Sequence, residues 1–187
     1  VVFWDNTSTD SSSDIFKKYS CKDNRFNYFY SHKHTILYDA RNLALKKCNG
    51  DIICFLDVDD FWIPSKLEKQ IKLFDDKDVG IVYGNFTVLT QSNKKTKVSF
   101  TKKLPSGYII DELLNKYCVG LLTIALRAEL VSNKKNFFNS EYHIIGDFDF
   151  VIEVAKKWKI IALQESIAFY RKHTNSESFK NRLLLGT

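Results

Sequence analysis

The sequence predicts an α/β fold, in which helices flank a central, mostly parallel sheet. In the first half, short apolar runs alternate with helical segments of about ten residues, the rhythm of strand–helix units. The run "DIICFL" at residues 51–56 is apolar after its first residue, as in a strand buried on both faces of a parallel sheet. The chain has 187 residues, 44% of them hydrophobic, so we expect one domain over residues 1–187.

The first half predicts two strand–helix pairs before this central strand. "VVFW" at residues 1–4 is a short apolar strand, and a turn-rich stretch leads from it to a short helix at residues 15–19. "RFNYFY" at residues 25–30 is an aromatic strand. Residues 38–48 have apolar side chains at helical spacing, and Gly50 can end that helix.

A third helix is expected at residues 64–74, after the central strand. Pro64 suits a first helical turn, and Ser65 with Glu68 has the spacing of a capping box. "VGIVYG" at residues 79–84 supplies the next strand.

The rhythm changes in the second half, where residues 86–100 alternate by two around a polar turn and predict a small hairpin. The remaining segments are expected as helices at 108–117 and 145–158 and as strands at 121–127, 159–164 and 166–173.

Charge and cysteine content restrict the function classes. The net charge of +6 could indicate an anionic partner, but the lysines come in scattered short groups, which is typical of a solvated surface. The four cysteines lack CxxC pairs, so we expect reduced thiols and a cytoplasmic location. The longest uncharged apolar stretch, at residues 119–126, is far shorter than the roughly 20 residues that cross a bilayer.

Three carboxylates, Asp57, Asp59 and Asp60, directly follow the central strand. Because each ionised group makes its neighbours costlier to ionise, we expect a cation there. In an extended chain Asp57 and Asp59 would face one side, roughly 6 to 7 Å apart, at the strand end where open α/β sheets bind ligands. Such oxygen ligands suit Mg²⁺ or Mn²⁺ shared with a diphosphate. The alternative is that Asp59 and Asp60 only shape the turn before the next helix.

A resemblance to a known family favours the ligand site. The segment "ARNLALKKCNGDIICFLDVDDFWIPSKLEKQI" resembles the nucleotide-binding half of the inverting family 2 glycosyltransferases, which have the Rossmann-like GT-A fold. "VVFWDNTSTDSS" resembles that family's second strand, with Thr7 where Gly is usual, and "YRKHTNSES" resembles the end of the catalytic domain. "IIGDFDF" resembles the acidic catalytic motif, with Gly146 in place of the usual Glu before Asp147. The family's opening strand and first helix have no counterpart, so we expect an N-terminally incomplete domain.

The resemblance implies an inverting transfer of a sugar from a nucleoside diphosphate sugar to a hydroxyl acceptor in polysaccharide or glycolipid synthesis. A UDP-sugar is the first candidate for the donor. Residues 1–85 would form the nucleotide-sugar-binding half, and residues 86–187 the acceptor-side half that carries the base. The cofactor would be Mn²⁺ or Mg²⁺. The acceptor would be a saccharide or a lipid-linked molecule, and no nucleic acid partner is expected. Peripheral membrane association and a homo-oligomer are left open.

Residue roles follow from the same resemblance. The expected nucleotide-sugar-binding residues are Asp5, Arg41, Asp57 and Arg171, the expected metal ligands are Asp59, Asp60 and His173, and the candidate catalytic bases are Asp147 and Asp149. An inverting transfer needs one carboxylate to take the proton of the acceptor hydroxyl, and Asp147 is the first choice. Each role has a plainer alternative, since an acidic residue that opens a helix is commonly a cap.

Two other functions stay open at this point. A sugar-phosphate nucleotidyltransferase would share the layered fold and an acidic metal site. A non-catalytic relative would bind a nucleotide or a polyanion without turnover. The sequence identifies neither the sugar nor the acceptor.

Overall fold

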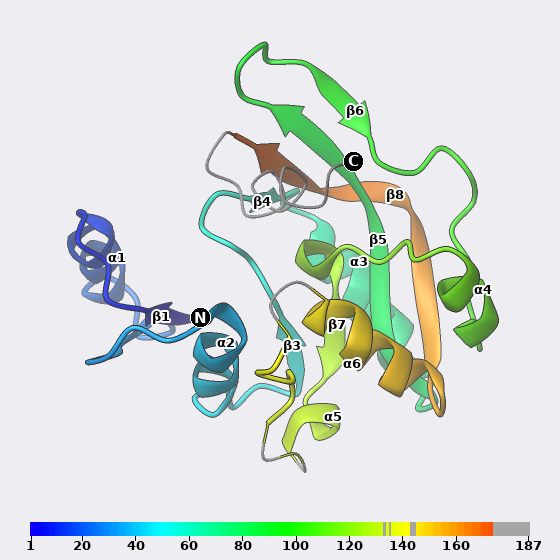
Figure 1. The fold of residues 1–187 in the computed structure, drawn as a ribbon, viewed down its shortest axis with the longest axis horizontal. Helices are drawn as coiled ribbons and strands as arrows, with labels where there is room; N and C mark the ends of the chain where they lie inside the picture. Colours follow the sequence, from blue (N-terminus) through cyan, green and yellow to red (C-terminus); the bar gives the residue numbers. More distant parts are fainter. Residues whose placement is uncertain (133, 135, 143–144, 174–187) are drawn as a thin grey trace. The chain divides into compact units, whose positions relative to one another are not determined.

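The structure, a computed structural model, describes residues 1–132, 134, 136–142 and 145–173 (Figure 1). The chain falls into two compact units. Unit 1 comprises Val1–Asp51 and Ala128–Val151, and unit 2 comprises Ile52–Arg127 and the chain from Ile152 onward. The division into halves at residues 85 and 86 stays a prediction.

Unit 1 contains a two-stranded parallel sheet and several helices. Its elements are β1 (Val2–Asp5), α1 (Ser12–Ser20), β2 (Asn27–Tyr30), α2 (Leu37–Leu45), α5 (Glu129–Ser132) and the first residues of α6 (Gly146–Ala155). Val2 lies opposite Asn27 in the sheet. The ring of Phe16 on α1 stacks on that of Phe3 with 4.4 Å between centroids, which fixes α1 against β1.

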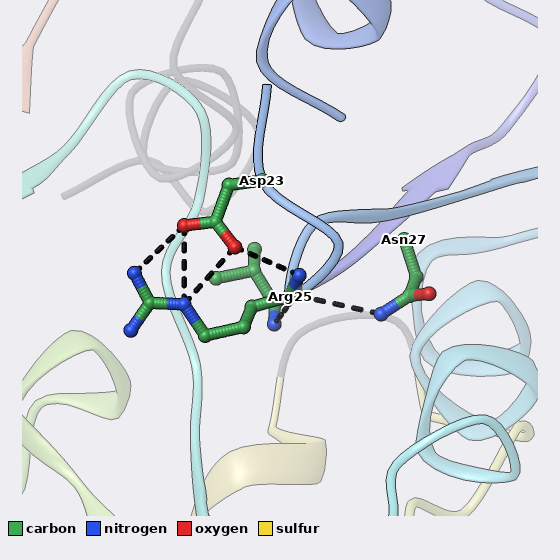
Figure 2. Close-up of polar contacts among 4 residues, drawn as sticks. Asp23, Arg25 and Asn27 are labelled. Carbon is green, nitrogen blue, oxygen red and sulfur yellow. Dashed lines mark hydrogen bonds and ion pairs between the residues drawn. The ribbon is translucent and has the colours of Figure 1, made fainter. Parts of the chain in front are cut away.

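The turn that leads into β2 is held by a local ion pair, which Figure 2 shows. Arg25 Nε and Nη2 donate to the carboxylate of Asp23 at 3.0 and 2.7 Å, and Asp23 also accepts from the Arg25 backbone N–H. Hydrogen bonds from Arg25 lower the pKa of Asp23 to about 2. Because the pair is exposed, we assign it a role in the shape of the turn.

Unit 2 is built on a six-stranded sheet with the order β3-β7-β5-β8-β4, to which β6 adds beside β5. The strands are β3 (Ile52–Cys54), β4 (Phe61–Trp62), β5 (Val79–Thr90), β6 (Thr96–Val98), β7 (Ala125–Arg127) and β8 (Lys159–Lys172). The helical segments are α3 (Lys66–Ile71), η1 (Lys72–Asp75), α4 (Ile110–Asn115) and η2 (Leu121–Thr123). A hydrophobic core cluster of unit 2 is formed by Phe74, Val79, Val82 and Ala125, with Ile52, Cys54, Leu73 and Ile161 packed against it.

The α/β class and the small hairpin, made by β5 and β6, are confirmed. The expectation of a mostly parallel sheet is wrong for unit 2. Among the described strands of this sheet, only β5 and β8 pair in parallel, whereas the other pairs are antiparallel. Apolar patterning predicts that a run is a strand, but it does not carry the direction of the partner strand.

Two local predictions also need correction. The strands expected at residues 159–164 and 166–173 form one strand, β8, because a register irregularity opposite Gly84 and Asn85 accommodates Gln164 and Glu165. The capping box is not formed, since Ser65 makes no side-chain cap bond and Glu68 pairs instead with Lys72 at 3.2 Å.

Helix α3 buries polar side chains and exposes apolar ones. Lys66 and Gln70 are fully buried, whereas Leu67 and Ile71 are 42% and 53% exposed. Gln70 Nε2 donates to the carbonyl oxygens of Val82 and Thr123 at 3.0 and 2.8 Å, so it ties α3 to the core. None of the helices in the described ranges combines the length and the apolar character of a membrane span.

Candidate functional site

The acidic cluster lies in a turn of unit 2 between β3 and β4. The N–H of Asp60 donates to the carbonyl oxygen of Asp57 at 3.0 Å, and Val58 at the tip is 86% exposed. The extended geometry expected for Asp57 and Asp59 is therefore wrong, because the backbone closes a four-residue turn there.

Strand pairing brings this turn beside the end of β8. Phe61 of β4 lies opposite Phe169 of β8, and their rings stack with 4.7 Å between centroids. As a result, His173 Nε2 lies 2.9 Å from Asp59 Oδ2, a hydrogen bond in which the imidazole N–H donates. The backbone N–H of Arg171 donates to Asp60 Oδ1 at 2.9 Å. Residues of unit 2 that are more than one hundred positions apart in the sequence therefore lie side by side.

The cluster contains a buried carboxylate, on Asp60, and a buried arginine nitrogen, on Arg171. Asp60 is 9% exposed, and burial, helped by the charges of Asp59 and Asp57, raises its pKa to about 6. The Nε atom of Arg171 is buried and has no hydrogen-bond partner among the described residues. A cation would relieve the carboxylates, and an anion would satisfy the arginine donor.

Asp59 and His173 place a carboxylate oxygen and an imidazole nitrogen side by side. A carboxylate oxygen and an imidazole nitrogen are ligand types that Mn²⁺ accepts, and cations that bind substrate phosphates use few protein ligands. Across the described ranges, no three His, Cys, Asp or Glu side chains gather as a metal site. The remaining ligands would therefore have to come from a bound diphosphate and from water.

In unit 1, Asp5 stands at the end of β1 with both carboxylate oxygens engaged. Tyr28 donates its hydroxyl to Oδ2 at 2.6 Å, and the N–H of Ser8 donates to Oδ1 at 2.7 Å. Burial opposes ionisation, but these hydrogen bonds outweigh it and lower the pKa of Asp5. This is the arrangement of a turn residue. Thr7 in the same turn has φ of 68°, the left-handed region in which glycine is favoured.

Helix α2 carries a residue that the sequence analysis missed, Asn42. Its buried Oδ1 accepts from the N–H groups of Phe137 and Phe138 at 3.0 and 2.9 Å, and its Nδ2 donates to the carbonyl oxygen of Phe138 at 2.8 Å. The guanidinium of Arg41 lies 5.8 and 5.9 Å from the ring centroids of Tyr38 and Phe138. The spacing of Tyr38, Asn42 and Leu45 on one helix face was the available signal.

Asp147 and Asp149 lie in the first turn of α6. The N–H of Gly146, the residue before Asp147, donates to the hydroxyl of Tyr38 at 2.9 Å. Asp149 lines a pocket of about 530 Å³ in unit 1. The other residues that line this pocket are Lys134, Asn136, Phe137, Phe138, Asn139, Ser140 and Glu141.

The structure distributes the remaining expected residues as follows. Asp5, Arg41, Asp147 and Asp149 belong to unit 1, whereas Asp57, Asp59, Asp60, Arg171 and His173 belong to unit 2. Residues 174–178 of the segment "YRKHTNSES" lie outside the described residues. The assigned roles stay predictions.

Comparisons with known proteins address the family. The family model described as "Glycosyl transferase family 2" matches residues 1–128. The chain is 28% identical over 129 residues to "Putative teichuronic acid biosynthesis glycosyltransferase TuaG" of Bacillus subtilis (strain 168). The aligned region covers 69% of this chain and 50% of that protein. The chain is 30% identical over 132 residues to "UDP-Glc:alpha-D-GlcNAc-diphosphoundecaprenol beta-1,3-glucosyltransferase WfgD" of Escherichia coli, which covers 71% of this chain and 50% of that protein. The chain thus spans about half the length of these relatives.

Solved structures address the fold. The complex of S. aureus TarS 1-349 with UDP has a TM-score of 0.73 at 20% identity and covers 93% of this chain and 51% of that one. The mannosyltransferase PcManGT of Pyrobaculum calidifontis, in complex with GDP-Man and Mn²⁺, has a TM-score of 0.67 at 15% identity and covers 97% of this chain and 49% of that one. These likenesses establish the GT-A fold.

Proposed function

The chain belongs to glycosyl transferase family 2, and we propose that it transfers a sugar from a nucleoside diphosphate sugar to a hydroxyl acceptor, with inversion, in the synthesis of a cell-surface polysaccharide or glycolipid. The observation that carries this proposal is the match of the family model to residues 1–128, which include α2 and the acidic turn. A UDP-sugar is the first donor to test, because TarS is solved with UDP and WfgD is named for UDP-Glc.

We assign the diphosphate of the donor to the end of β8 and the acidic turn. Asp59 and His173 would hold Mn²⁺ or Mg²⁺, with Asp60 beside them, and the free Nε donor of Arg171 would bind a diphosphate oxygen. When bound, the cation supplies neutralising charge for the departing nucleoside diphosphate. Asp57 would lie on the ribose side of the donor.

We propose the following roles for the residues of unit 1. Asp147 would accept the proton of the acceptor hydroxyl as that oxygen attacks the anomeric carbon, so no covalent sugar intermediate forms. Asp149 competes for this role because it lines the 530 Å³ pocket. Asp5 and Arg41 would contact the nucleotide. The family match disfavours a sugar-phosphate nucleotidyltransferase. A non-catalytic relative would differ from an active glycosyltransferase only in showing no turnover.

We also propose that the reaction takes place in the cytoplasm, at a membrane surface. The free cysteines agree with a reducing compartment. The β5–β6 hairpin carries the exposed Lys94, Lys95 and Lys97, and no acidic residue occurs between Asp78 and Asp111. The lysines of that stretch are Lys94, Lys95, Lys97, Lys102 and Lys103. Binding to phosphatidylglycerol vesicles should fall when the first three become glutamine, and not when Lys17, Lys18 and Lys22 do.

Calorimetric titration of UDP, with and without Mn²⁺, tests the diphosphate site. We expect Mn²⁺-dependent binding that weakens at least about tenfold in Asp59→Asn, since the variant loses a charged ligand. Asp75→Asn, at an exposed position of unit 2, is the matched control and should bind like the wild type. UDP affinity that is independent of Mn²⁺ and equal in all three proteins would refute the assignment.

A further inference from the structure

The hydroxyl of Tyr38 meets the start of helix α6. Tyr38 lies on α2 and is 4% exposed, and its oxygen accepts the N–H of Gly146 at 2.9 Å. The first N–H groups of a helix have no partner within the helix, and a side-chain oxygen usually accepts them. Here a phenol oxygen from a distant part of the chain takes that position.

Gly146 is required by the ring of Tyr38. A Cβ atom at residue 146 would lie 2.7 Å from the Cε2 and Cζ atoms of Tyr38, well inside the normal contact distance. The φ angle of Gly146 is not in the left-handed region, so the glycine is needed for space and not for its backbone freedom. Tyr38 and Gly146 therefore form a matched pair, in which the ring fills the volume of the missing side chain.

The Tyr38 ring is itself fixed in place. It stacks on Phe138 with 5.4 Å between centroids, and Asn42 holds the backbone of Phe138 through two hydrogen bonds. Burial, and after it the charge of Asp147, raises the pKa of the Tyr38 hydroxyl.

We propose that Tyr38 is a positioning residue for Asp147. Through the hydrogen bond to Gly146, it fixes the first turn of α6 and with it the direction of the Asp147 carboxylate. The proposal rests on the proposed function of Asp147 as the base. It also accounts for the departure from the family's acidic motif, since a glutamate at residue 146 would collide with the ring.

Tyr38→Phe tests the proposal, because it removes the hydroxyl and keeps the ring. Tyr83→Phe is the matched control, since Tyr83 is a fully buried tyrosine of unit 2 whose hydroxyl donates to the carbonyl oxygen of Pro105 at 2.8 Å. The first readout is amide hydrogen exchange by NMR, which needs no activity. We expect the Gly146 amide to exchange about tenfold faster in Tyr38→Phe than in Tyr83→Phe, the effect of losing about one hydrogen bond.

The second readout is kinetic. We expect Tyr38→Phe to lower kcat by about tenfold and to leave KM for the donor within about twofold, because an orientation needed for chemistry is lost while donor binding is not. Unchanged exchange at Gly146, or kinetic losses equal to those of Tyr83→Phe, would overturn the proposal. A wild-type protein without turnover would refute the proposed function, whereas the exchange experiment decides the Tyr38 contact by itself.

Discussion

Gly146→Ala is a sharp test of the packing around the start of α6. The added Cβ would lie 2.7 Å from two atoms of the Tyr38 ring and 2.9 Å from a third. Carbon atoms in contact are normally about 3.5–4.0 Å apart, so the ring would have to move by about 1 Å. That movement disturbs both the stacking on Phe138 and the hydrogen bond to the Gly146 N–H. We predict a loss of about 1–3 kcal/mol in the free energy of unfolding, the usual cost of overpacking.

The sign of this effect is informative. In a helix without the collision, Gly→Ala stabilises by up to about 1 kcal/mol, so the two outcomes differ in direction. The assay is urea unfolding, followed by circular dichroism, of the wild type, Gly146→Ala, Tyr38→Ala and the double variant. Without the ring, the Gly146→Ala change should cost nothing, which gives a coupling energy of about 1–3 kcal/mol between the two positions.

Two results would refute this reasoning. One is a Gly146→Ala protein as stable as the wild type or more stable. The other is an equal cost of Gly146→Ala with and without the Tyr38 ring, which would trace the cost to the backbone of α6 and not to the collision.

Three further predictions concern stability. Thr7→Gly should raise the free energy of unfolding by about 0.5–1 kcal/mol in urea titrations. The reason is that the strain of threonine at φ of 68° exceeds the entropy cost of glycine. A lower free energy of unfolding in the variant would contradict this prediction. Tyr28→Phe should lower stability at pH 7 by about 1.5–3 kcal/mol through the lost bond to Asp5. Since the pKa of Asp5 is lowered in the fold, this stability is present above its ordinary value of 3.8 and is lost in acid, so the two proteins should converge there. Burial lowers the pKa of Lys66, so the unfolded chain binds more protons than the folded chain as pH approaches 10.5. The free energy of unfolding of the wild type should therefore rise in this range relative to that of Lys66→Met. Parallel curves of stability against pH for the two proteins would count against this prediction.

The order of elements could be predicted from local patterns. Apolar runs such as residues 79–84 and the alternation around the hairpin are properties of neighbouring residues, and the strands were found there. The directions of the partner strands could not be predicted, since they depend on contacts across the sheet. Helix α3 shows the limit most clearly: its apolar Leu67 and Ile71 are exposed, whereas its polar Gln70 is buried and donates to backbone oxygens of the core.

The candidate site was predictable only in part. Three neighbouring carboxylates and the family resemblance led to Asp59 and His173, which the β4–β8 pairing brings within 2.9 Å. The Tyr38–Gly146 contact joins residues more than one hundred positions apart, and no local pattern reports such a pair. Asn42 was overlooked because a polar residue on a helix is usually exposed, whereas here its amide bonds the backbone of residues 137 and 138.

The central claim is sugar transfer with inversion. Its most direct test is incubation with UDP-Glc, UDP-GlcNAc or GDP-Man, Mn²⁺ and a saccharide or lipid-linked acceptor, with NMR of the anomeric proton in the product. We predict a product of inverted configuration whose formation requires Mn²⁺ and is lost in Asp147→Asn. A product of retained configuration, or turnover that is unchanged in Asp147→Asn, would contradict the account.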